Sequence, residues 1–108
     1  MTRSSADEVR FWSIAEPLLG TAAITRSTMM GFPCLRVSGQ FFASFDRRTN
    51  ALIVKLPATR VQHLIESGEA DPFAPAGRMF REWATIKPNR HSVWPSLIDE
   101  ALAFVAAR

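Results

Sequence analysis

The side chains that could do chemistry in this chain are few and are separated along the sequence. Cys34 lies between Pro33 and Leu35 in an apolar stretch and has no adjacent histidine that would favour the thiolate. His63 and His91 lie in different segments, and neither is at metal-ligand spacing from Cys34 or from a pair of carboxylates. We therefore expect a buried thiol, two exposed histidines and no metal site.

Two further features match catalytic or phosphate-binding motifs only in part. Ser44 lies in the segment Phe-Ala-Ser-Phe, which lacks the glycines that expose a nucleophilic serine on a tight turn. The stretch 75–78, Pro-Ala-Gly-Arg, has one glycine and no lysine, so it does not match a phosphate-binding loop. The sequence therefore predicts a protein that is not an enzyme and that needs no cofactor.

Glu82 is an acidic residue within an apolar pattern. Phe80, Ala84 and Ile86 share one face of a strand predicted over residues 79–86, and strict alternation places Glu82 on that face. A buried carboxylate has to pair with a cation or titrate abnormally. We favour a structural ion pair, or a bulge or strand end that brings Glu82 to solvent, over a functional carboxylate.

The regular structure that positions these groups begins with a helix predicted over residues 6–19. Ser5 and Glu8 have the spacing of a capping box, in which the hydroxyl accepts a hydrogen bond from the amide of Glu8 and the carboxylate reaches back. Apolar residues then recur at helical spacing, and Pro17 predicts a break in the helix. Residues 22–30, rich in Ile, Thr, Ser and Met, favour an extended strand.

Three short segments with period-two alternation follow, at 34–37, 41–46 and 51–56. Turn residues separate them, which is the pattern of an antiparallel meander. One face of this meander is apolar enough to pack against helices. The residues predicted on that face are Leu35, Val37, Phe41, Ala43, Phe45, Leu52, Val54 and Leu56.

The second half of the chain adds two helices and one strand. Pro57 opens a helix over 58–67, the Pro- and Gly-rich stretch 69–77 is a loop, and the strand over 79–86 precedes a helix over 93–107. Together these elements predict an α+β fold in one domain that spans all 108 residues. Its central antiparallel sheet has about four or five strands, with an N-terminal helix, a helix after the meander and a C-terminal helix.

Composition places the chain among ordinary globular proteins. Of its 108 residues, 47% are hydrophobic and 21% charged, with a net charge of +3, a balance that excludes a disordered chain. No apolar run approaches the roughly 20 residues that span a bilayer. Acidic residues at positions 7 and 8 stand where a signal peptide would be apolar, and there is one cysteine. The sequence therefore predicts a cytoplasmic protein with no membrane partner.

Several short motifs follow one another in a specific order: Met30-Gly31-Phe32-Pro33, Arg36-Val37-Ser38-Gly39-Gln40-Phe41-Phe42-Ala43, Val54-Lys55-Leu56-Pro57, Glu82-Trp83 and Glu100-Ala101. In this order the chain resembles the MmcQ/YjbR family and, more distantly, the N-terminal domain of the competence regulator TfoX. The resemblance implies an α+β fold with a central antiparallel sheet and helices from both ends of the chain packed against it. It implies no settled activity and supplies no catalytic residues. DNA binding has been suggested for the family mainly from its fold.

A binding surface is predicted on the other face of the sheet. That face displays Arg36, Phe42, Ser44, Ile53 and Lys55, with Arg81 and Trp83 in the matching register. Cations suit phosphates and rings suit base stacking, which is worth roughly 1–3 kcal/mol per base. Arg47 and Arg48, at a hairpin tip, could touch a phosphate backbone as a wing would. The sequence thus predicts a small binding domain whose leading partner is DNA.

The same residues allow a second interpretation. Apolar side chains on both faces of a sheet often mean that both faces are covered. Phe42, Ile53 and Trp83 could lie beneath the helix over 58–67, or at the interface of a homodimer or of a complex with another protein. The sequence leaves this alternative open, together with the exposure of the second sheet face.

Overall fold

The computed structural model of the chain describes residues 5–21, 23–29 and 31–108. Residues 1–4, which formed part of the expectation about a signal peptide, lie outside the described residues. Ala22 and Met30, the two ends of the predicted extended segment, also lie outside them. Met30 is also the first residue of the motifs that carry the family resemblance, so that position of the resemblance lies outside the described residues as well.

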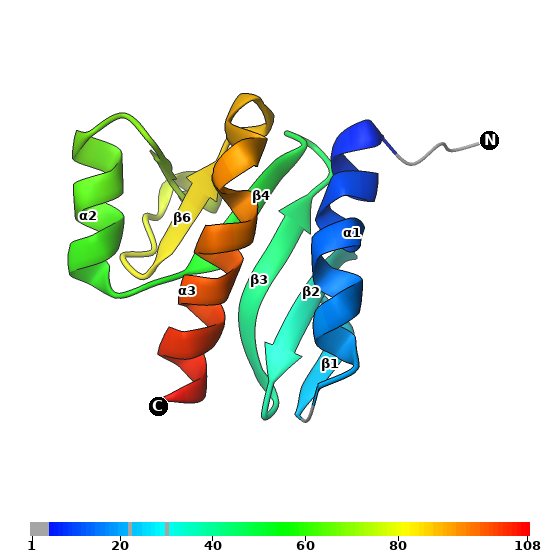
Figure 1. The fold of residues 1–108 in the computed structure, drawn as a ribbon. Coiled ribbons are helices and arrows are strands. Elements are labelled where there is room, and N and C mark those ends of the chain that lie inside the picture. Colours follow the sequence, from blue (N-terminus) through cyan, green and yellow to red (C-terminus); the bar gives the residue numbers. More distant parts are fainter. Residues whose placement is uncertain (1–4, 22, 30) are drawn as a thin grey trace.

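The described residues form three α-helices and a six-stranded antiparallel sheet (Figure 1), which confirms the predicted α+β fold. In chain order the helices and strands are α1 (Ala6–Leu19), β1 (Ile24–Met29), β2 (Phe32–Val37), β3 (Gln40–Asp46), β4 (Ala51–Lys55), α2 (Ala58–Glu66), β5 (Asp71–Pro72), β6 (Trp83–Ile86) and α3 (Trp94–Ala106). Two short 3-10 helices, η1 (Pro75–Gly77) and η2 (Pro88–Val93), precede β6 and α3.

The strands follow the order β1-β2-β3-β4-β6-β5 across the sheet, and each neighbouring pair is antiparallel. The described sheet has one strand more than the upper end of the predicted range. The additional strand is β5, whose two residues pair with Thr85 and Ala84 of β6. It lies in the stretch 69–77, where proline and glycine content predicted only a loop, because a two-residue strand is too short to show alternation.

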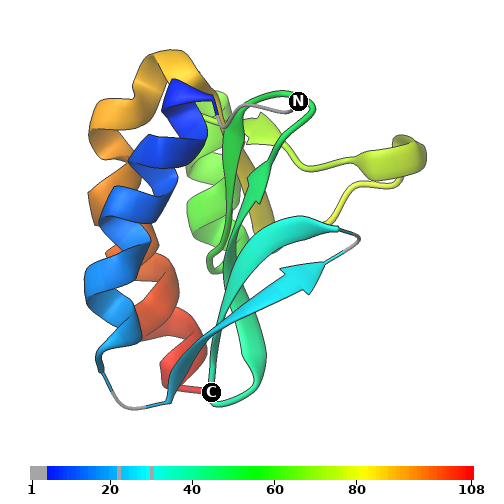
Figure 2. The same cartoon turned by 90° about the vertical axis from the view of Figure 1, so that its right-hand side faces the viewer.

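All three helices lie on one side of the sheet, as Figures 1 and 2 show together. α3 crosses β3 and β4, α1 lies beside β1, and α2 packs against β5 and β6 at the other end of the sheet. The hydrophobic core fills the space between the helices and the sheet. Its largest fully buried apolar side chains include Trp94, Phe11, Phe42, Phe45, Leu35, Leu52, Leu56, Ile86 and Ile98.

The first helix begins as predicted, with one change of partner. The Ser5 hydroxyl accepts a hydrogen bond from the amide of Glu8 at 3.0 Å, but the Glu8 carboxylate binds Arg47 on the β3–β4 turn and does not close the capping box. The helix is continuous through Pro17, so the predicted break is absent. The carbonyl that loses its partner belongs to Ser13, four residues earlier, which is exposed and therefore accessible to water.

Strict alternation fails in β3, at Phe42. Leu35 of β2 lies opposite Ala43, whereas Arg36 lies opposite Phe41, so β3 holds one extra residue at this point. Phe42 is 0% exposed and belongs to the hydrophobic core, while Phe41 is partly exposed. The predictions that Phe41 faces the core and that Phe42 lies on the second face are therefore both wrong, and one β-bulge accounts for both errors.

The last strand is shorter than predicted. β6 begins at Trp83, and residues 79–82 form the loop and turn that lead into it. Glu82 therefore lies at the strand end, where its carboxylate is 3.0 Å from Arg108 and 3.9 Å from Lys55. The structural ion pair favoured for Glu82 is confirmed.

Candidate nucleic-acid interface

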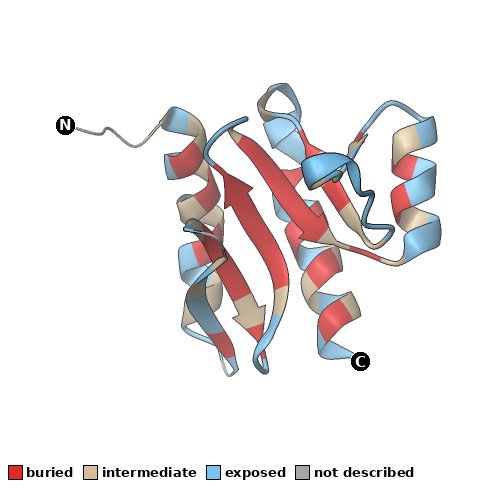
Figure 3. Cartoon of the chain, turned by 180° about the vertical axis from the view of Figure 1, so that it is seen from behind, coloured by how far each residue is buried: buried red, intermediate tan, exposed pale blue. Residues whose placement is uncertain are grey.

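Among the described residues, no α-helix covers the second face of the sheet, which we call the helix-free face (Figure 2). Two segments flank it. Strands β1 and β2 slant outward at one end, and the segment 73–82, which contains η1, projects at the other end (Figures 2 and 3). The second interpretation of the sequence allowed α2 to cover this face, and α2 does not cover it. The face is also not a flat open sheet, because these two segments flank it.

The centre of the helix-free face is closed to solvent. Cys34, Ser44 and Ile53 lie in register on β2, β3 and β4, and none is more than 4% exposed. The Ser44 hydroxyl donates a hydrogen bond to the Pro33 carbonyl at 3.0 Å, so this buried polar group is satisfied. Burial raises the pKa of the Cys34 thiol, and the predicted buried thiol is confirmed.

Cations paired with aromatic rings surround this closed centre. The distance from the guanidinium carbon to the centre of the ring is 4.3 Å for Arg36 over Phe41, 5.2 Å for Arg48 over Phe32 and 5.5 Å for Arg78 over Phe80. The Nζ of Lys55 lies 5.7 Å from the centre of the Trp83 ring. We call these eight residues the basic-aromatic rim. Contacts of this kind are worth about 0.5–1 kcal/mol at exposed sites. Contacts of this strength favour these positions of the long side chains, so part of the ordering of the positive groups precedes the arrival of a ligand.

Arg36 is the rim cation that lies nearest to its ring, at 4.3 Å from the centre of Phe41. Its side chain is partly buried, and its Nε is a buried donor that has no hydrogen-bond partner among the described residues. A guanidinium that stacks on a ring still presents its outer plane and its remaining N–H groups. These can stack with a base and donate to a phosphate.

Carboxylates neutralise part of the charge on this side of the molecule. Asp46 accepts hydrogen bonds from the backbone amide of Arg48 at 2.8 Å and from its Nε at 3.4 Å. Glu82 lies 3.9 Å from Lys55. Within the ranges that the structure describes, the cations of this side that form no ion pair are Arg36, Arg78 and Arg81.

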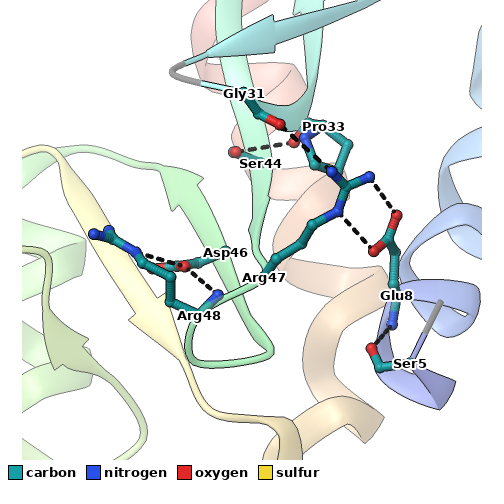
Figure 4. A network of polar contacts seen from close by, with 8 residues as sticks. All are labelled: Ser5, Glu8, Gly31, Pro33, Ser44, Asp46, Arg47 and Arg48. Carbon is teal, nitrogen blue, oxygen red and sulfur yellow. Dashed lines mark hydrogen bonds and ion pairs between the residues drawn. The ribbon is translucent and has the colours of Figure 1, made fainter. Parts of the chain in front are cut away.

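Arg47 has a structural role that sequence reasoning missed (Figure 4). Its Nε and Nη2 donate to the two carboxylate oxygens of Glu8 at 2.9 Å each, and its Nη1 lies 3.5 Å from the carbonyl oxygen of Gly31. The hydrogen bonds from Arg47 hold the pKa of Glu8 below its ordinary value. Arg47 thus ties α1 to the β3–β4 turn, so of the predicted wing pair only Arg48 lies in the rim.

The structure brings together most of the residues that the sequence predicted as contacts. Arg36, Arg48, Lys55 and Trp83 all belong to the rim, and Arg81 is exposed beside it. Phe42 does not belong there because it is part of the core, and Phe41 takes its place. The members that sequence reasoning missed are Phe32, Phe41, Arg78 and Phe80, whose only sequence signal is an aromatic residue or an arginine next to a predicted turn.

The remaining titratable candidates do not gather into a site. His63 and His91 are exposed, as predicted. In the part of the chain that the structure describes, no group of three or more His, Cys, Asp or Glu side chains is placed to hold a metal ion. None of the helices there combines the length and the apolar character that crossing a membrane requires.

A scan against models of known protein families, a search of curated proteins and a search of solved structures each found no match for the chain. The function has to be inferred from the residues and contacts of this chain.

Proposed function

We propose that this domain binds single-stranded DNA through the basic-aromatic rim, by charge and stacking and without reading base sequence. The observation that carries the proposal is the Arg36 guanidinium, 4.3 Å above the Phe41 ring on a sheet face without a covering helix in the described structure. The resemblance to the MmcQ/YjbR family, for which DNA binding has been suggested, points to the same class of partner.

A single strand suits the rim better than a duplex. Unpaired bases are free to stack on a ring or on a guanidinium plane, each for roughly 1–3 kcal/mol. Specific duplex readers usually insert a helix or a β-ribbon into the major groove. Here each of the three α-helices lies on the opposite side of the sheet (Figure 2). Arg36, Arg78 and Arg81 remain available to neutralise phosphates.

We expect labelled oligo(dT) to bind at low salt and to dissociate as the salt concentration rises. If three phosphates are neutralised, the logarithm of the affinity falls with a slope of about −2 against the logarithm of the salt concentration. This corresponds to a loss of about 20-fold between about 50 and 200 mM. Fluorescence anisotropy over a salt series measures the slope, with a duplex of equal length as comparison. Absence of binding at the lowest salt, or tighter binding of the duplex, would contradict the proposal.

A pair of matched variants distinguishes the contribution of the rim to DNA affinity from the contribution of the net charge. Arg36→Gln should weaken oligo(dT) binding about 5- to 10-fold and reduce the salt slope by about 0.7. Arg26→Gln is the control, because Arg26 also stacks on a ring, 4.2 Å from Trp12, but lies opposite Leu35 and so faces the helices. Its effect should stay within about 2-fold. Equal losses in the two variants would show that total charge, and not the rim, controls binding.

The alternative of a partner interface through Phe42, Ile53 and Trp83 has little support in the exposure of these residues. Phe42 is 0% and Ile53 is 4% exposed within the single chain, so neither offers surface to a partner. Only Trp83 remains partly exposed. We therefore base no proposal on a two-fold interface at the helix-free face.

A further inference from the structure

A pocket of about 320 Å³ opens between α2 and the segment that leads into β6. Val61 and Ile65 of α2 form one wall, and Met79, Phe80 and Trp83 form much of the other. Ligand pockets in proteins usually measure about 300–1,000 Å³, so this pocket suits one small molecule and is too small for a peptide helix.

Within residues 5–21, 23–29 and 31–108, the large apolar side chains that are both exposed and adjacent in sequence lie at this pocket. Met79 is 54% and Phe80 is 38% exposed, and both line the pocket. The other exposed large apolar side chains among the described residues, Val9 and Val93, are far from each other in the sequence. Scattered single residues of that kind are normal on protein surfaces, whereas adjoining ones beside a pocket indicate a surface that a ligand covers.

Among the described residues that line the pocket, Arg81 is the one that carries a charge. The Arg78 guanidinium lies 5.5 Å from the centre of the Phe80 ring, which also lines the pocket. Neither arginine forms an ion pair with any residue that the structure describes. On the α2 side, the carboxylate of Glu66 accepts a hydrogen bond from the Gln62 side-chain amide at 3.1 Å. A ligand with an anionic end therefore finds its partner at Arg81.

We propose that this pocket binds a small amphipathic carboxylate, such as a medium-chain aliphatic acid. Its apolar body lies between Val61, Ile65 and Trp83, Met79 and Phe80 close over it, and its carboxylate pairs with Arg81. The proposal does not depend on DNA binding, and it is tested in the absence of DNA.

The probe is octanoate, used below its micelle concentration with the full chain labelled for nitrogen–proton correlation spectra. Shift changes should be confined to α2 and to residues 72–83, with a dissociation constant below about 1 mM. The uncharged match, 1-octanol, should bind in the same place about 5- to 10-fold more weakly. Absence of shifts in that concentration range, or shifts elsewhere on the molecule, would overturn the proposal.

Two variants and a control assign the binding energy to the pocket. Arg81→Gln should weaken octanoate about 5- to 10-fold and leave 1-octanol unchanged, because it removes only the charge. Met79→Ser should weaken both ligands. Val9→Ser, at a position on α1 that is 58% exposed against 54% for Met79, should weaken neither. All three side chains are exposed, so the spectra should show the folded pattern. Octanoate binding to Arg81→Gln with wild-type affinity would also overturn the proposal.

Discussion

Truncation of Phe42 to alanine is expected to destabilise the domain by about 3–5 kcal/mol, as much as truncation of Phe45. Both rings are 0% exposed and belong to the same core. The centre of the Phe45 ring lies 5.8 Å from that of Phe11 and 6.2 Å from that of Trp94, so removal of this ring leaves a large cavity. A loss of this size is a large share of the roughly 5–15 kcal/mol that holds a domain folded. Urea denaturation measures this loss of stability from the shift of the unfolding midpoint, provided that the dependence of the unfolding free energy on urea concentration is unchanged.

The neighbouring ring provides the control for this prediction. Phe41→Ala removes the same side chain one residue earlier, where it is partly exposed beneath Arg36, and should cost only about 1 kcal/mol. The same variant should clearly weaken oligo(dT) binding, because the Arg36 guanidinium loses its support. If Phe41→Ala proved as damaging to stability as Phe42→Ala, the assignment of the bulge in β3 would be incorrect.

Removal of Arg47 is the second substitution with a large expected effect. Arg47→Ala leaves the Glu8 carboxylate, which is 10% exposed, without the two hydrogen bonds at 2.9 Å that now satisfy it. The expected loss is about 1–2 kcal/mol at neutral pH. It stays below the value for a fully buried pair because the Arg47 side chain is itself 52% exposed, so water screens the interaction.

The same ion pair predicts a dependence of stability on pH. The hydrogen bonds from Arg47 lower the pKa of Glu8 from its ordinary value of 4.5, so the folded state binds the proton less readily than the unfolded state. The stabilisation is therefore complete above about pH 4.5 and is lost as the pH falls through the lowered pKa of the folded state. Arg47→Ala should remove this part of the acid dependence. Denaturation midpoints measured from neutral pH down into the acid range test it.

Arg48→Ala is the matched control on the same turn. Arg48 is 68% exposed and its Nε lies 3.4 Å from Asp46, whose carboxylate keeps a hydrogen bond to the backbone amide of residue 48 at 2.8 Å. Its loss should cost less than about 0.5 kcal/mol and leave the acid dependence unchanged. Similar losses for the two arginines would mean that the tie between α1 and the turn contributes little.

The closed centre of the helix-free face bears on the proposed binding of DNA. Cys34, Ser44 and Ile53 are buried although no α-helix of the described residues lies above them, so the side chains around them border a packed, fixed surface with a satisfied polar group beneath it. A fixed surface lowers the entropy lost on binding, since the cations of the rim are already restrained by their rings.

Most of the elements were predictable from the sequence because their causes are local. The Ser5 cap, the apolar spacing in α1 and α3 and the turn residues between the meander strands all act within a few residues of the chain. The placement of Arg36 and Lys55 on the same sheet face also follows from period-two alternation, because the bulge in β3 leaves the alternation within β2 and β4 intact.

The candidate site depended on contacts between distant segments, which local patterns do not contain. The bulge at Phe42 arises from how β3 pairs with β2. The sequence of apolar residues in β3 is compatible with both the regular and the bulged register. Glu8 and Arg47 meet across 39 residues, in a chain with many other acidic and basic residues available to each. The placement of all three helices on one side of the sheet, which leaves the other face for the rim, is likewise a result of packing. Local periodicity specifies which residues point the same way along an element, whereas which elements meet is decided by the burial and ion pairing of the whole fold.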